Sequence, residues 1–513
     1  MFSNNLPHLK QAIAAFPPLR WLWPVLWVFV VLRLIYWFTA FPNPDEAYYW
    51  LWGQHPGLSY YDHPPLLAWI QGLFSHLLGR SAFTLRLPNL ITTGLLVFLY
   101  SRICNRLFGP SATPHFWLTV ALLFASPLYF LFLALAWPDH LLILFSLLAT
   151  FWFWTFLETY RADSRGESWR LFSAAIALAL AILCKYNASF VILACLVVIL
   201  ASKRHRPLLS DWRLYLAGAI VASGLLPILL WNTFNDFQSF QYYVNRSVKP
   251  TGFQLKIWDC VGFVLFSILM FSPLHSFALV RVLRRPALWL NQQPLYWRLA
   301  LWVFSLSSLI LLGISLISTA LYYWNITAYL LLLPLLSGFF LSKPQNGQAP
   351  NLSKPSLFLS TQILGLFFAV LLVVHYCLLP ISALFGPDGD PDSRMLFGWK
   401  TVGHAVLQAR TELSGQPFLA TTDYRSASAL AYELNEPEVT AISDRIDQFD
   451  FWNDQNRAFK GRDAVLLADD WHPMPPALLA RFERVSEPFT IPVRRMNVWI
   501  KNYYVFKAFS FEG

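Results

Sequence analysis

The sequence WLWPVLWVFVVLRLIYWFTAF at residues 21–41 is followed directly by PNPDEAYYWLWGQHPGLSYYDHPPLLAWI at residues 42–70. The first stretch has about the 20 apolar residues that a helix needs to cross a bilayer. The second places ionisable side chains among tyrosines, tryptophans and prolines. These side chains are Asp45, Glu46, Asp62 and His63. Charge beside hydrocarbon is costly and usually functional, so the sequence predicts a catalytic loop held at a membrane surface.

The composition of the chain is that of an integral membrane protein. Its 513 residues are 56% hydrophobic and only 13% charged, whereas about a quarter of the residues of a soluble domain are charged. The formal net charge of +10 is explained by Lys and Arg at the inner ends of membrane spans. No basic stripe with interleaved base-stacking aromatics stands apart from these spans, so we expect no nucleic-acid partner.

Apolar runs recur along most of the chain and predict a polytopic α-helical membrane protein with about eleven transmembrane helices. The first run is long enough to span, and no small-residue cleavage pattern follows it, so we expect an anchor rather than a cleaved signal. The predicted spans are 21–41, 85–107, 115–136, 140–157, 170–184, 187–202, 213–231, 258–280, 298–318, 321–341 and 356–380.

The distribution of Lys and Arg predicts the orientation of these spans. With the N-terminus in the cytoplasm, every inner connection is basic and the outer connections hold few cations, as the positive-inside rule requires. The loop 42–84, Asp139, Lys185 and the loop 232–257 then all face outward, as does the chain after about residue 381. We therefore predict a multi-pass protein with its N-terminus in the cytoplasm and its C-terminus outside.

A change of composition near residue 385 divides the sequence into two predicted domains. Residues 1–384 are expected to form a transmembrane catalytic domain that carries the first loop 42–84. Residues 385–513 begin with a polar linker and are expected to form a small soluble α/β domain. In this domain we expect helices at 401–413 and 425–434 and strands at 418–421, 439–442, 464–468 and 498–508.

Asp45 and Glu46 lie just after the first predicted span. A partly desolvated carboxylate at this place has a raised pKa and can act as a general base. The alternative is a helix cap, because an Asp after Asn-Pro commonly starts a helix. Tyr61, Asp62 and His63 lie in the second half of the loop. There His63 can be a cation, or the segment can be an interfacial aromatic belt with a turn.

Further polar residues are predicted on the same side of the membrane. Asp139 opens the fourth span and either caps its helix or points into an outer cavity. Lys185 either extends to the interface or pairs with an anion. Asn232 and Arg246 belong to the loop that follows the seventh span, and Tyr323 either packs against a sugar ring or belongs to the interfacial belt. Carboxylates with separated cations fit transfer of a group from a phosphate-bearing lipid, in which cations hold the leaving phosphate and a carboxylate deprotonates the acceptor.

Several short motifs resemble those of a known family. DEAYY at 45–49 and YYDHPPL at 60–66 resemble the bacterial members of the protein O-mannosyltransferase and aminoarabinose (lipid A) transferase superfamily. These are glycosyltransferases of the GT-C fold, grouped with glycosyltransferase family 39. Further matches are PDHL at 138–141, CKYN at 184–187, WN and SF at 231–240, SPL at 272–274, YWNITAY at 323–329 and GWKTVGHAV at 398–406.

The resemblance implies a polyprenyl-phosphate-linked sugar as donor and inversion at the anomeric centre. It implies a lipid A, glycolipid, glycan or protein acceptor at the periplasmic face of the bacterial inner membrane. Asp45 matches the family's essential first-loop aspartate, Asp139 its second acidic position, and Lys185 a lysine that contacts the donor phosphate. His63 stands where the aminoarabinose transferases have lysine, and Asp62 where they have glutamate, so we do not expect an aminoarabinose transferase.

The expected site therefore has two groups of residues and no metal-specific spacing. The expected catalytic residues are Asp45, Glu46 and Asp139. The expected donor-phosphate and substrate-binding residues are Tyr61, Asp62, His63, Lys185, Asn232, Arg246 and Tyr323. We expect no required cofactor, with a divalent cation as an open alternative. Membrane lipids are the remaining expected partners.

A second class of protein competes with this hypothesis, a transporter or flippase of lipid-linked sugars. Such a protein is expected to have polar residues at mid-membrane, within broken helices. Here the polar residues concentrate at the outer ends of the predicted spans. The sequence therefore favours glycosyl transfer.

Overall fold

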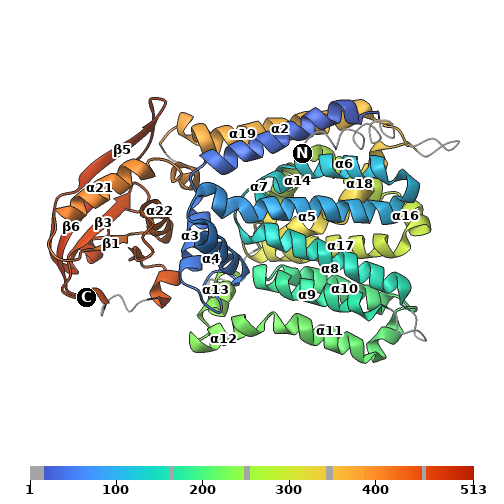
Figure 1. The fold of residues 1–513 in the computed structure, drawn as a ribbon, viewed down its shortest axis with the longest axis horizontal. Coiled ribbons are helices and arrows are strands. Elements are labelled where there is room, and N and C mark those ends of the chain that lie inside the picture. The colour runs from blue at the N-terminus through green and yellow to red at the C-terminus, as the bar shows by residue number, and fades with distance from the viewer. Residues whose placement is uncertain (1–16, 161–166, 248–254, 343–349, 388, 453–457) are drawn as a thin grey trace. The chain divides into compact units, whose positions relative to one another are not determined.

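The computed structural model describes residues 17–160, 167–247, 255–342, 350–387, 389–452 and 458–513 (Figure 1). The chain divides into two compact units. The helical unit comprises Met1–Leu32, Asn89–Ala134 and Pro138–Val370, and the mixed unit comprises Arg33–Pro88, Leu135–Trp137 and Leu371–Gly513. The first loop thus shares a unit with the C-terminal residues. The domain boundary at residue 384, which was predicted from the change of composition, stays a prediction.

Five helical segments in the described part of the chain are long and apolar enough to cross a membrane. Three bent pairs of helices pass the same test together, which gives up to eight spans if each pair counts as one. The prediction of a polytopic helical membrane protein is confirmed, and the count of about eleven spans stays a prediction. The five segments are Leu19–Thr39, Ala82–Ala125, Pro138–Thr159, Pro294–Ile317 and Pro355–Leu378.

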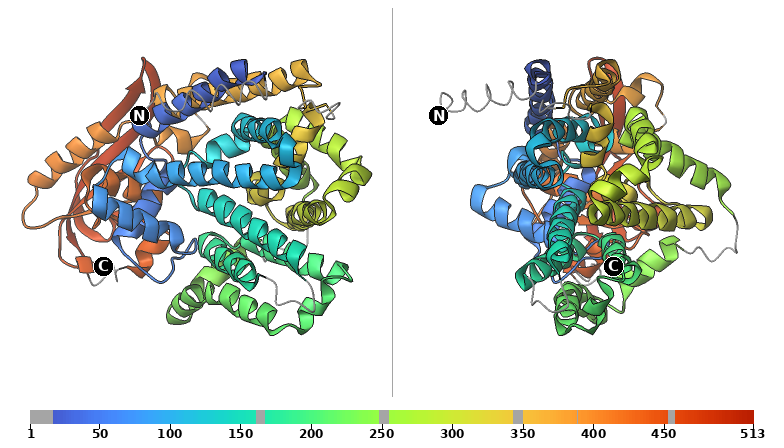
Figure 2. Two further views of the ribbon diagram at one scale, coloured as in Figure 1. Left: turned by 45° about the vertical axis from the view of Figure 1, so that its right-hand side comes forward. Right: turned by 90° about the vertical axis from the view of Figure 1, so that its right-hand side faces the viewer.

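Helices α2 (Leu19–Thr39) and α19 (Pro355–Val373) lie side by side in both sets of views (Figures 1 and 2). Trp21 packs edge-to-face on Phe358 in this pair, with ring centroids 5.9 Å apart. Both helices cross from one unit to the other, as does α5 (Ala82–Phe108). The other longer elements of the helical unit are α6 (Ala112–Ala125), α7 (Pro127–Phe132), α8 (Pro138–Thr159), α9 (Ser168–Cys184), α10 (Ala188–Ala201), α11 (Trp212–Ser223), α12 (Leu226–Phe234), α13 (Gln238–Ser247), α14 (Ile257–Phe271), α15 (Pro273–Leu283), α16 (Pro286–Gln292), α17 (Pro294–Ile317), η4 (Tyr322–Tyr329) and α18 (Leu333–Phe340).

The predicted span 258–280 is not one straight helix. Its two halves, α14 and α15, are bent by 98° at Ser272, which has a φ of 90°. Proline at 273 disfavours the helical conformation of the residue before it and has no N–H to continue the hydrogen-bond ladder. The run is apolar on both sides of the bend, so periodicity alone does not reveal the break.

The first loop contains two helices, and the first of them starts where the helix-cap alternative for Asp45 placed a helix start. They are α3 (Pro44–Gln54) and α4 (Leu66–Leu78), which pack against each other. Gly53 of α3 faces Gly72 of α4, and a Cβ built on Gly53 would lie 2.5 Å from the backbone nitrogen of Gly72. The two backbones can approach this closely because neither glycine has a side chain.

Gly53→Ala is expected to destabilise the protein by about 1–3 kcal/mol, the usual cost of forcing extra volume into a packed contact. The thermal unfolding midpoint of the purified protein measures this change. Gly94→Ala is the matched control, because a Cβ at that helical glycine meets nothing within 4 Å; it is expected to be neutral or slightly stabilising. Equal midpoints for both variants would contradict the close approach of α3 and α4.

The C-terminal part of the mixed unit is built on a mixed sheet. Its strands are β1 (Phe418–Thr421), β2 (Thr440–Ala441), β3 (Ala464–Asp469), β4 (Phe482–Val485), β5 (Phe489–Arg495) and β6 (Val498–Phe511). Their order is β2-β1-β3-β6-β4, and β5 also pairs with β6. β1 is parallel to β2 and β3, whereas β6 is antiparallel to all three of its neighbours. The predicted α/β domain is therefore present.

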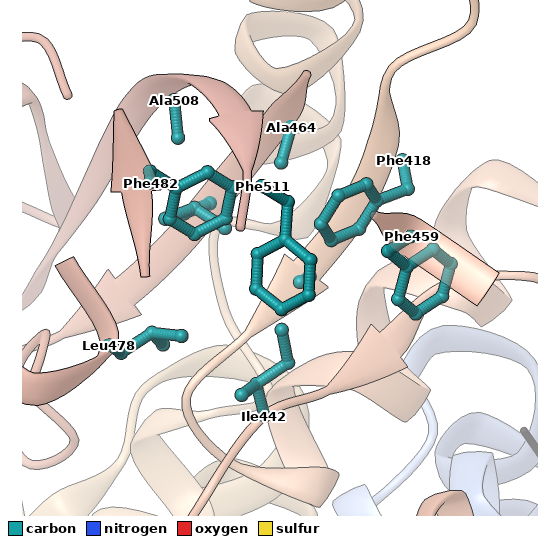
Figure 3. Close-up of a cluster of buried hydrophobic side chains, with 10 residues drawn as sticks. Phe418, Ile442, Phe459, Ala464, Leu478, Phe482, Ala508 and Phe511 are labelled. Carbon is teal, nitrogen blue, oxygen red and sulfur yellow. The ribbon is translucent and has the colours of Figure 1, made fainter. Parts of the chain in front are cut away.

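Apolar side chains pack on the sheet. Successive residues of a strand point to opposite faces of a sheet. Phe418 and Ala464 pair in the β1–β3 register and belong to a buried cluster (Figure 3). In this cluster Phe418 stacks on Phe459, with ring centroids 4.2 Å apart. Helices α21 (Trp399–Thr411) and α22 (Tyr424–Leu434) also pack on the sheet. Because β1 is parallel to both β2 and β3, the carboxyl ends of these three strands lie at the same edge of the sheet.

Candidate functional site

The first turn of α3 has a side-chain cap, but Asp45 does not provide it. The Asn43 side chain accepts a hydrogen bond from the Asp45 backbone N–H at 3.1 Å. In return the Asn43 N–H donates to Glu46 Oε2 at 2.8 Å, which completes a capping box. Asn43 is thus the N-cap, and the carboxylate of Asp45 is available for another role.

Glu46 is fully buried and ion-paired. Arg86 donates from Nη2 to Glu46 Oε2 at 2.6 Å and from Nε to Oε1 at 2.9 Å, and neither side chain is exposed. The Ala136 N–H donates to Glu46 Oε1 at 2.7 Å. Arg86 also donates to the Ala40 carbonyl at 3.0 Å, close to the end of α2. These contacts give Glu46 a structural role, and the catalytic role expected from the sequence stays a prediction.

Asp45 lies in a different environment from its neighbour. Its side chain is partly exposed, and Tyr424 Oη donates to Asp45 Oδ1 at 3.4 Å. Burial among the residues of the mixed unit raises the pKa of the Asp45 carboxyl to about 6, and the negative charge of Asp392 adds to this effect. A carboxylate with this pKa can accept a proton near neutral pH.

Asp62 connects the first loop to the C-terminal part of the same unit. Its Oδ2 accepts from Tyr48 Oη at 2.9 Å, and its Oδ1 accepts from Arg445 Nη2 at 3.0 Å. The hydroxyl of Tyr48 in turn accepts from the Gln448 N–H at 2.8 Å. Asp62 is therefore placed where its charge acts on the surroundings of Asp45.

The other two predicted residues of the first loop make aromatic contacts. The Tyr61 N–H donates to Gln448 Oε1 at 2.7 Å, and the Tyr61 ring stacks on Phe451 with centroids 5.4 Å apart. The His63 ring is partly exposed and lies 5.9 Å from the Tyr49 ring. The structure thus brings Asp45, Asp62, Tyr61 and His63 into one unit, and their binding roles stay predictions.

Asp139 and Lys185 form a buried pair within the helical unit. Lys185 Nζ lies 2.9 Å from both carboxylate oxygens of Asp139, which is in the first turn of α8. The ammonium group also lies 4.8 Å from the centroid of the Tyr323 ring, at cation–π distance. Lys185 follows the last residue of α9 in an extended conformation. Three predicted residues, distant in the sequence, therefore meet here.

The structure describes the side chain of Asn232 but not that of Arg246. The Asn232 side chain is buried and donates to the Ile228 carbonyl at 2.9 Å, while its Oδ1 accepts from the Phe240 N–H at 3.3 Å. These bonds hold the turn between α12 and α13. Arg246 lies in α13, and its side chain is outside the described part of the structure. A role for either residue in substrate binding stays a prediction.

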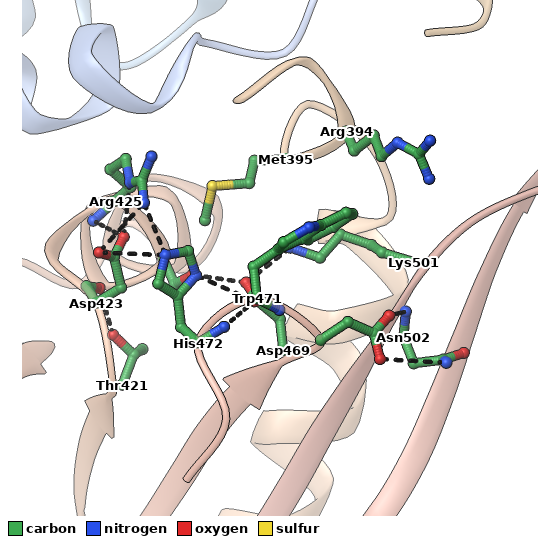
Figure 4. Close-up of polar contacts among 12 residues, drawn as sticks. Arg394, Met395, Thr421, Asp423, Arg425, Asp469, Trp471, His472, Lys501 and Asn502 are labelled. Carbon is green, nitrogen blue, oxygen red and sulfur yellow. Dashed lines mark hydrogen bonds and ion pairs between the residues drawn. The ribbon is translucent and has the colours of Figure 1, made fainter. Parts of the chain in front are cut away.

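A polar network at the carboxyl ends of β1 and β3 contains residues that sequence reasoning missed (Figure 4). Lys501 Nζ contacts Asp469 Oδ2 at 2.7 Å, and His472 Nδ1 lies 3.1 Å from Asp469 Oδ1. Although burial alone would raise it, the contacts with His472 and Lys501 hold the pKa of the Asp469 carboxyl well below its usual range. Arg425 joins this network, 2.7 Å from His472 Nε2 and 2.9 Å from Asp423.

Comparison with known proteins shows which proteins the chain is similar to. A family model described as dolichyl-phosphate-mannose-protein mannosyltransferase matches residues 62–231. The lipid A galacturonosyltransferase RgtD of Rhizobium johnstonii is 26% identical over 196 residues, which are 37% of this chain and 38% of that relative. ArnT of Cupriavidus metallidurans in the apo state aligns with a TM-score of 0.60 at 14% identity, covering 93% of this chain and 97% of that chain. With undecaprenyl phosphate bound, ArnT aligns with a TM-score of 0.59, again at 14% identity, over 95% and 98%.

The two ArnT alignments show the fold of the chain. Over nearly its whole length the chain has the fold of ArnT, a membrane-spanning GT-C fold with a small C-terminal sheet domain. The chain is similar to glycosyltransferase family 39-like proteins, and its long apolar helices are those of a membrane protein. The family resemblance of its motifs is thereby confirmed.

Proposed function

We propose that the protein is a glycosyltransferase that moves a sugar from a polyprenyl-phosphate-sugar donor to an acceptor, with inversion at the anomeric carbon. The acceptor is a lipid A, glycolipid, glycan or protein group at the periplasmic face of the bacterial inner membrane. The observation that carries the proposal is the placement of Asp45, a partly exposed carboxylate that accepts a hydrogen bond from Tyr424 Oη at 3.4 Å and whose pKa is raised by burial to about 6. The names of the matched family model and of RgtD, a lipid A galacturonosyltransferase, support it.

The proposed reaction is a single displacement. The acceptor hydroxyl oxygen forms a bond to the anomeric carbon while the bond from that carbon to the phosphate oxygen breaks. The electron pair of the broken bond leaves with the polyprenyl phosphate, and the acceptor proton goes to the Asp45 carboxylate. If the acceptor is a phosphate, its oxygen is already ionised, and Asp45 orients the sugar or the acceptor. No metal ion takes part in this scheme, and assays with and without EDTA check that point.

Lys185 has the proposed role of holding the donor phosphate. Its side chain is buried, and its Nζ forms an ion pair with Asp139 Oδ1 at 2.9 Å. A phosphate that gains negative charge as it leaves is stabilised by such a fixed cation in a water-poor site. Asp139 then holds the lysine in place when no phosphate is bound.

Lys185→Met is expected to raise the KM for the lipid-linked donor at least about tenfold, because a charge-assisted contact contributes roughly 1.5–3 kcal/mol. This variant also leaves the buried Asp139 carboxylate without its ion-pair partner, which is destabilising in its own right. The double variant Lys185→Met with Asp139→Asn removes both charges. If Lys185 holds phosphate, donor binding stays weak in the double variant; full recovery would reduce Lys185 to a structural partner. Lys256→Met, at a partly exposed pair, is the control.

The direct test of the proposal uses the purified full-length protein in liposomes. A radiolabelled polyprenyl-phosphate sugar is supplied with extracted lipid A, glycolipids, glycans or membrane proteins, and the transferred label is identified by mass spectrometry. A new glycosidic bond of inverted configuration is the expected product. Retained anomeric configuration, or no transfer of any donor to any of these acceptors, would contradict the proposal.

One observation favours transport of lipid-linked sugars as a second candidate function. Three apolar helix pairs are bent, by 43°, 98° and 70°, and broken helices are typical of transporters. The breaks lie at Gly224–Leu225, at Ser272 and at Leu330–Leu332, and these residues include no ionisable side chain. Broken helices that coordinate ions or charged substrates usually present polar groups, so glycosyl transfer remains the better supported function. Translocation of labelled donor across liposomes without a new glycosidic bond would favour transport.

A further inference from the structure

Asp45 belongs to the first loop, but the residues that surround its carboxylate come mostly from the C-terminal part of the mixed unit. Tyr424, the first residue of α22, donates its hydroxyl to Asp45 Oδ1 at 3.4 Å. The Tyr424 ring also packs on Tyr48 of α3, with ring centroids 4.8 Å apart. Tyr424 is therefore held by ring packing while its hydroxyl reaches Asp45.

Arg445 lies on the same tyrosine. Its guanidinium carbon is 4.4 Å from the centroid of the Tyr424 ring, at cation–π distance. Arg445 also pairs with Asp62 at 3.0 Å, and Asp62 is bonded to Tyr48. These contacts form a closed ring of four side chains, Tyr424, Arg445, Asp62 and Tyr48, and the Tyr424 hydroxyl joins Asp45 to it. All five residues belong to the mixed unit.

A second arginine, Arg425, also acts on Asp45. It pairs with Asp392 at 2.6 Å and with Asp423 at 2.9 Å, so two carboxylates offset one guanidinium. Arg445 pairs with the carboxylate of Asp62 at 3.0 Å, and its side chain is 43% exposed. Both arginines favour the ionised form of Asp45, and Arg445 lies closer to the Tyr424 ring, with its guanidinium carbon 4.4 Å from the centroid against 5.7 Å for Arg425.

We propose that Tyr424 and Arg445 are positioning residues of the Asp45 site, where Tyr424 orients the carboxylate and Arg445 balances its charge. The C-terminal sheet domain then completes the catalytic site instead of serving as a separate module. This inference rests on the proposed function for its catalytic meaning. Its physical content, the control of one carboxyl group by two residues of the C-terminal domain, can be measured without any transfer assay.

The charges that face Asp45 predict how each residue acts. Asp392 and Asp62 raise the pKa of the Asp45 carboxyl, and Arg425 and Arg445 lower it, in addition to the larger effect of burial. Loss of the Arg445 charge therefore raises this pKa further above about 6. Loss of the Tyr424 hydroxyl acts in the same direction, because a hydrogen bond to a carboxylate favours the charged form.

The first experiment measures the titration of Asp45 directly in the full-length protein. A water-soluble carbodiimide reacts with protonated carboxyl groups, and mass spectrometry of the Asp45 peptide gives the extent of modification at each pH. The midpoint is expected near pH 6 in the unaltered protein. In Arg445→Gln and in Tyr424→Phe it is expected to rise, by about one unit for the charge change.

The matched control is Arg484→Gln. Arg484 is also exposed and also lies over an aromatic ring, with its guanidinium carbon 4.2 Å from the centroid of Phe509, but it belongs to β4 and is not among the charges that act on Asp45. Arg484→Gln is expected to leave the midpoint unchanged. Arg445→Lys keeps the charge and is expected to hold the midpoint near that of the unaltered protein.

The second readout is the pH profile of sugar transfer. If Asp45 acts as a carboxylate, its acid limb is expected to move to higher pH in Arg445→Gln by the same amount as the modification midpoint. Equal midpoints in Arg445→Gln, Tyr424→Phe and the unaltered protein would overturn the inference. Absence of transfer by the unaltered protein, with shifted midpoints in the variants, would instead count against the proposed function alone. Should Arg445→Gln fail to fold, the Tyr424→Phe midpoint still decides.

Discussion

Asp45→Asn is expected to reduce sugar transfer by about 10²–10⁴-fold, the usual contribution of a positioned general base, without loss of folded protein. The amide has nearly the shape of the carboxylate but cannot accept the acceptor proton. Folding is expected to survive because Asn43, and not Asp45, caps α3, and because the Asp45 side chain is partly exposed. Initial rates with a radiolabelled polyprenyl-phosphate sugar measure the loss.

The pH dependence gives this prediction a second measurement. Asp45 is active when ionised, so transfer is expected to rise with pH through about 6 and to level off above it. The residual activity of Asp45→Asn should lack this limb. Asp392→Asn is the control, since Asp392 is exposed, pairs with Arg425 and adds negative charge near Asp45; it should retain transfer and move the limb to lower pH. Near-normal turnover by folded Asp45→Asn would exclude Asp45 as the base.

The fold was largely predictable because its elements have strong apolar periodicity. The helices expected at 401–413 and 425–434 are α21 and α22, and the four expected strands are β1, β2, β3 and β6. The two strands that were not predicted, β4 and β5, pair only with β6. β5 contains Pro492 and ends in two arginines, a composition that edge strands tolerate and that patterning does not identify.

Individual residues of the candidate site were predicted from the sequence, but the contacts between them were not. Asp139 and Lys185 were each expected from their position beside apolar runs, but their pairing depends on the packing of α8 and α9. Tyr424 and Arg445 were not expected to be near Asp45, because they are 379 and 400 residues away in the chain. One indication was present: both follow predicted strands, and ligands of open α/β sheets bind beyond the carboxyl ends of parallel strands.

Glu46 shows most clearly what the sequence could not decide. Asp45 and Glu46 are adjacent acidic residues, and both were expected to be catalytic. The helical turn places Glu46 toward Arg86, 40 residues further along the chain, where the two form a fully buried pair at 2.6 Å. Asp45 points instead toward Tyr424. Two adjacent positions on α3 therefore hold a candidate general base, Asp45, and a structural carboxylate, Glu46.

Glu46→Gln is expected to lower the free energy of unfolding by about 3–5 kcal/mol, because it leaves the buried Arg86 charge without its partner. The hydrogen bonds from Asn43 and Ala136 weaken as well, since the neutral amide has a single acceptor oxygen. The thermal unfolding midpoint and the yield of monodisperse protein measure this loss. Transfer per folded molecule should change little.

A double variant and an exposed ion pair test the cause of that effect. Glu46→Leu combined with Arg86→Met removes both buried charges and is expected to recover much of the stability lost in Glu46→Gln, because replacing a buried pair with apolar residues is often neutral or stabilising. Glu158→Gln breaks the partly exposed pair with Arg106 at 2.7 Å and is expected to cost at most about 1 kcal/mol. If Glu46→Gln kept its unfolding midpoint but lost transfer, Glu46 would belong to the chemistry, and the structural role argued from its contacts would be wrong.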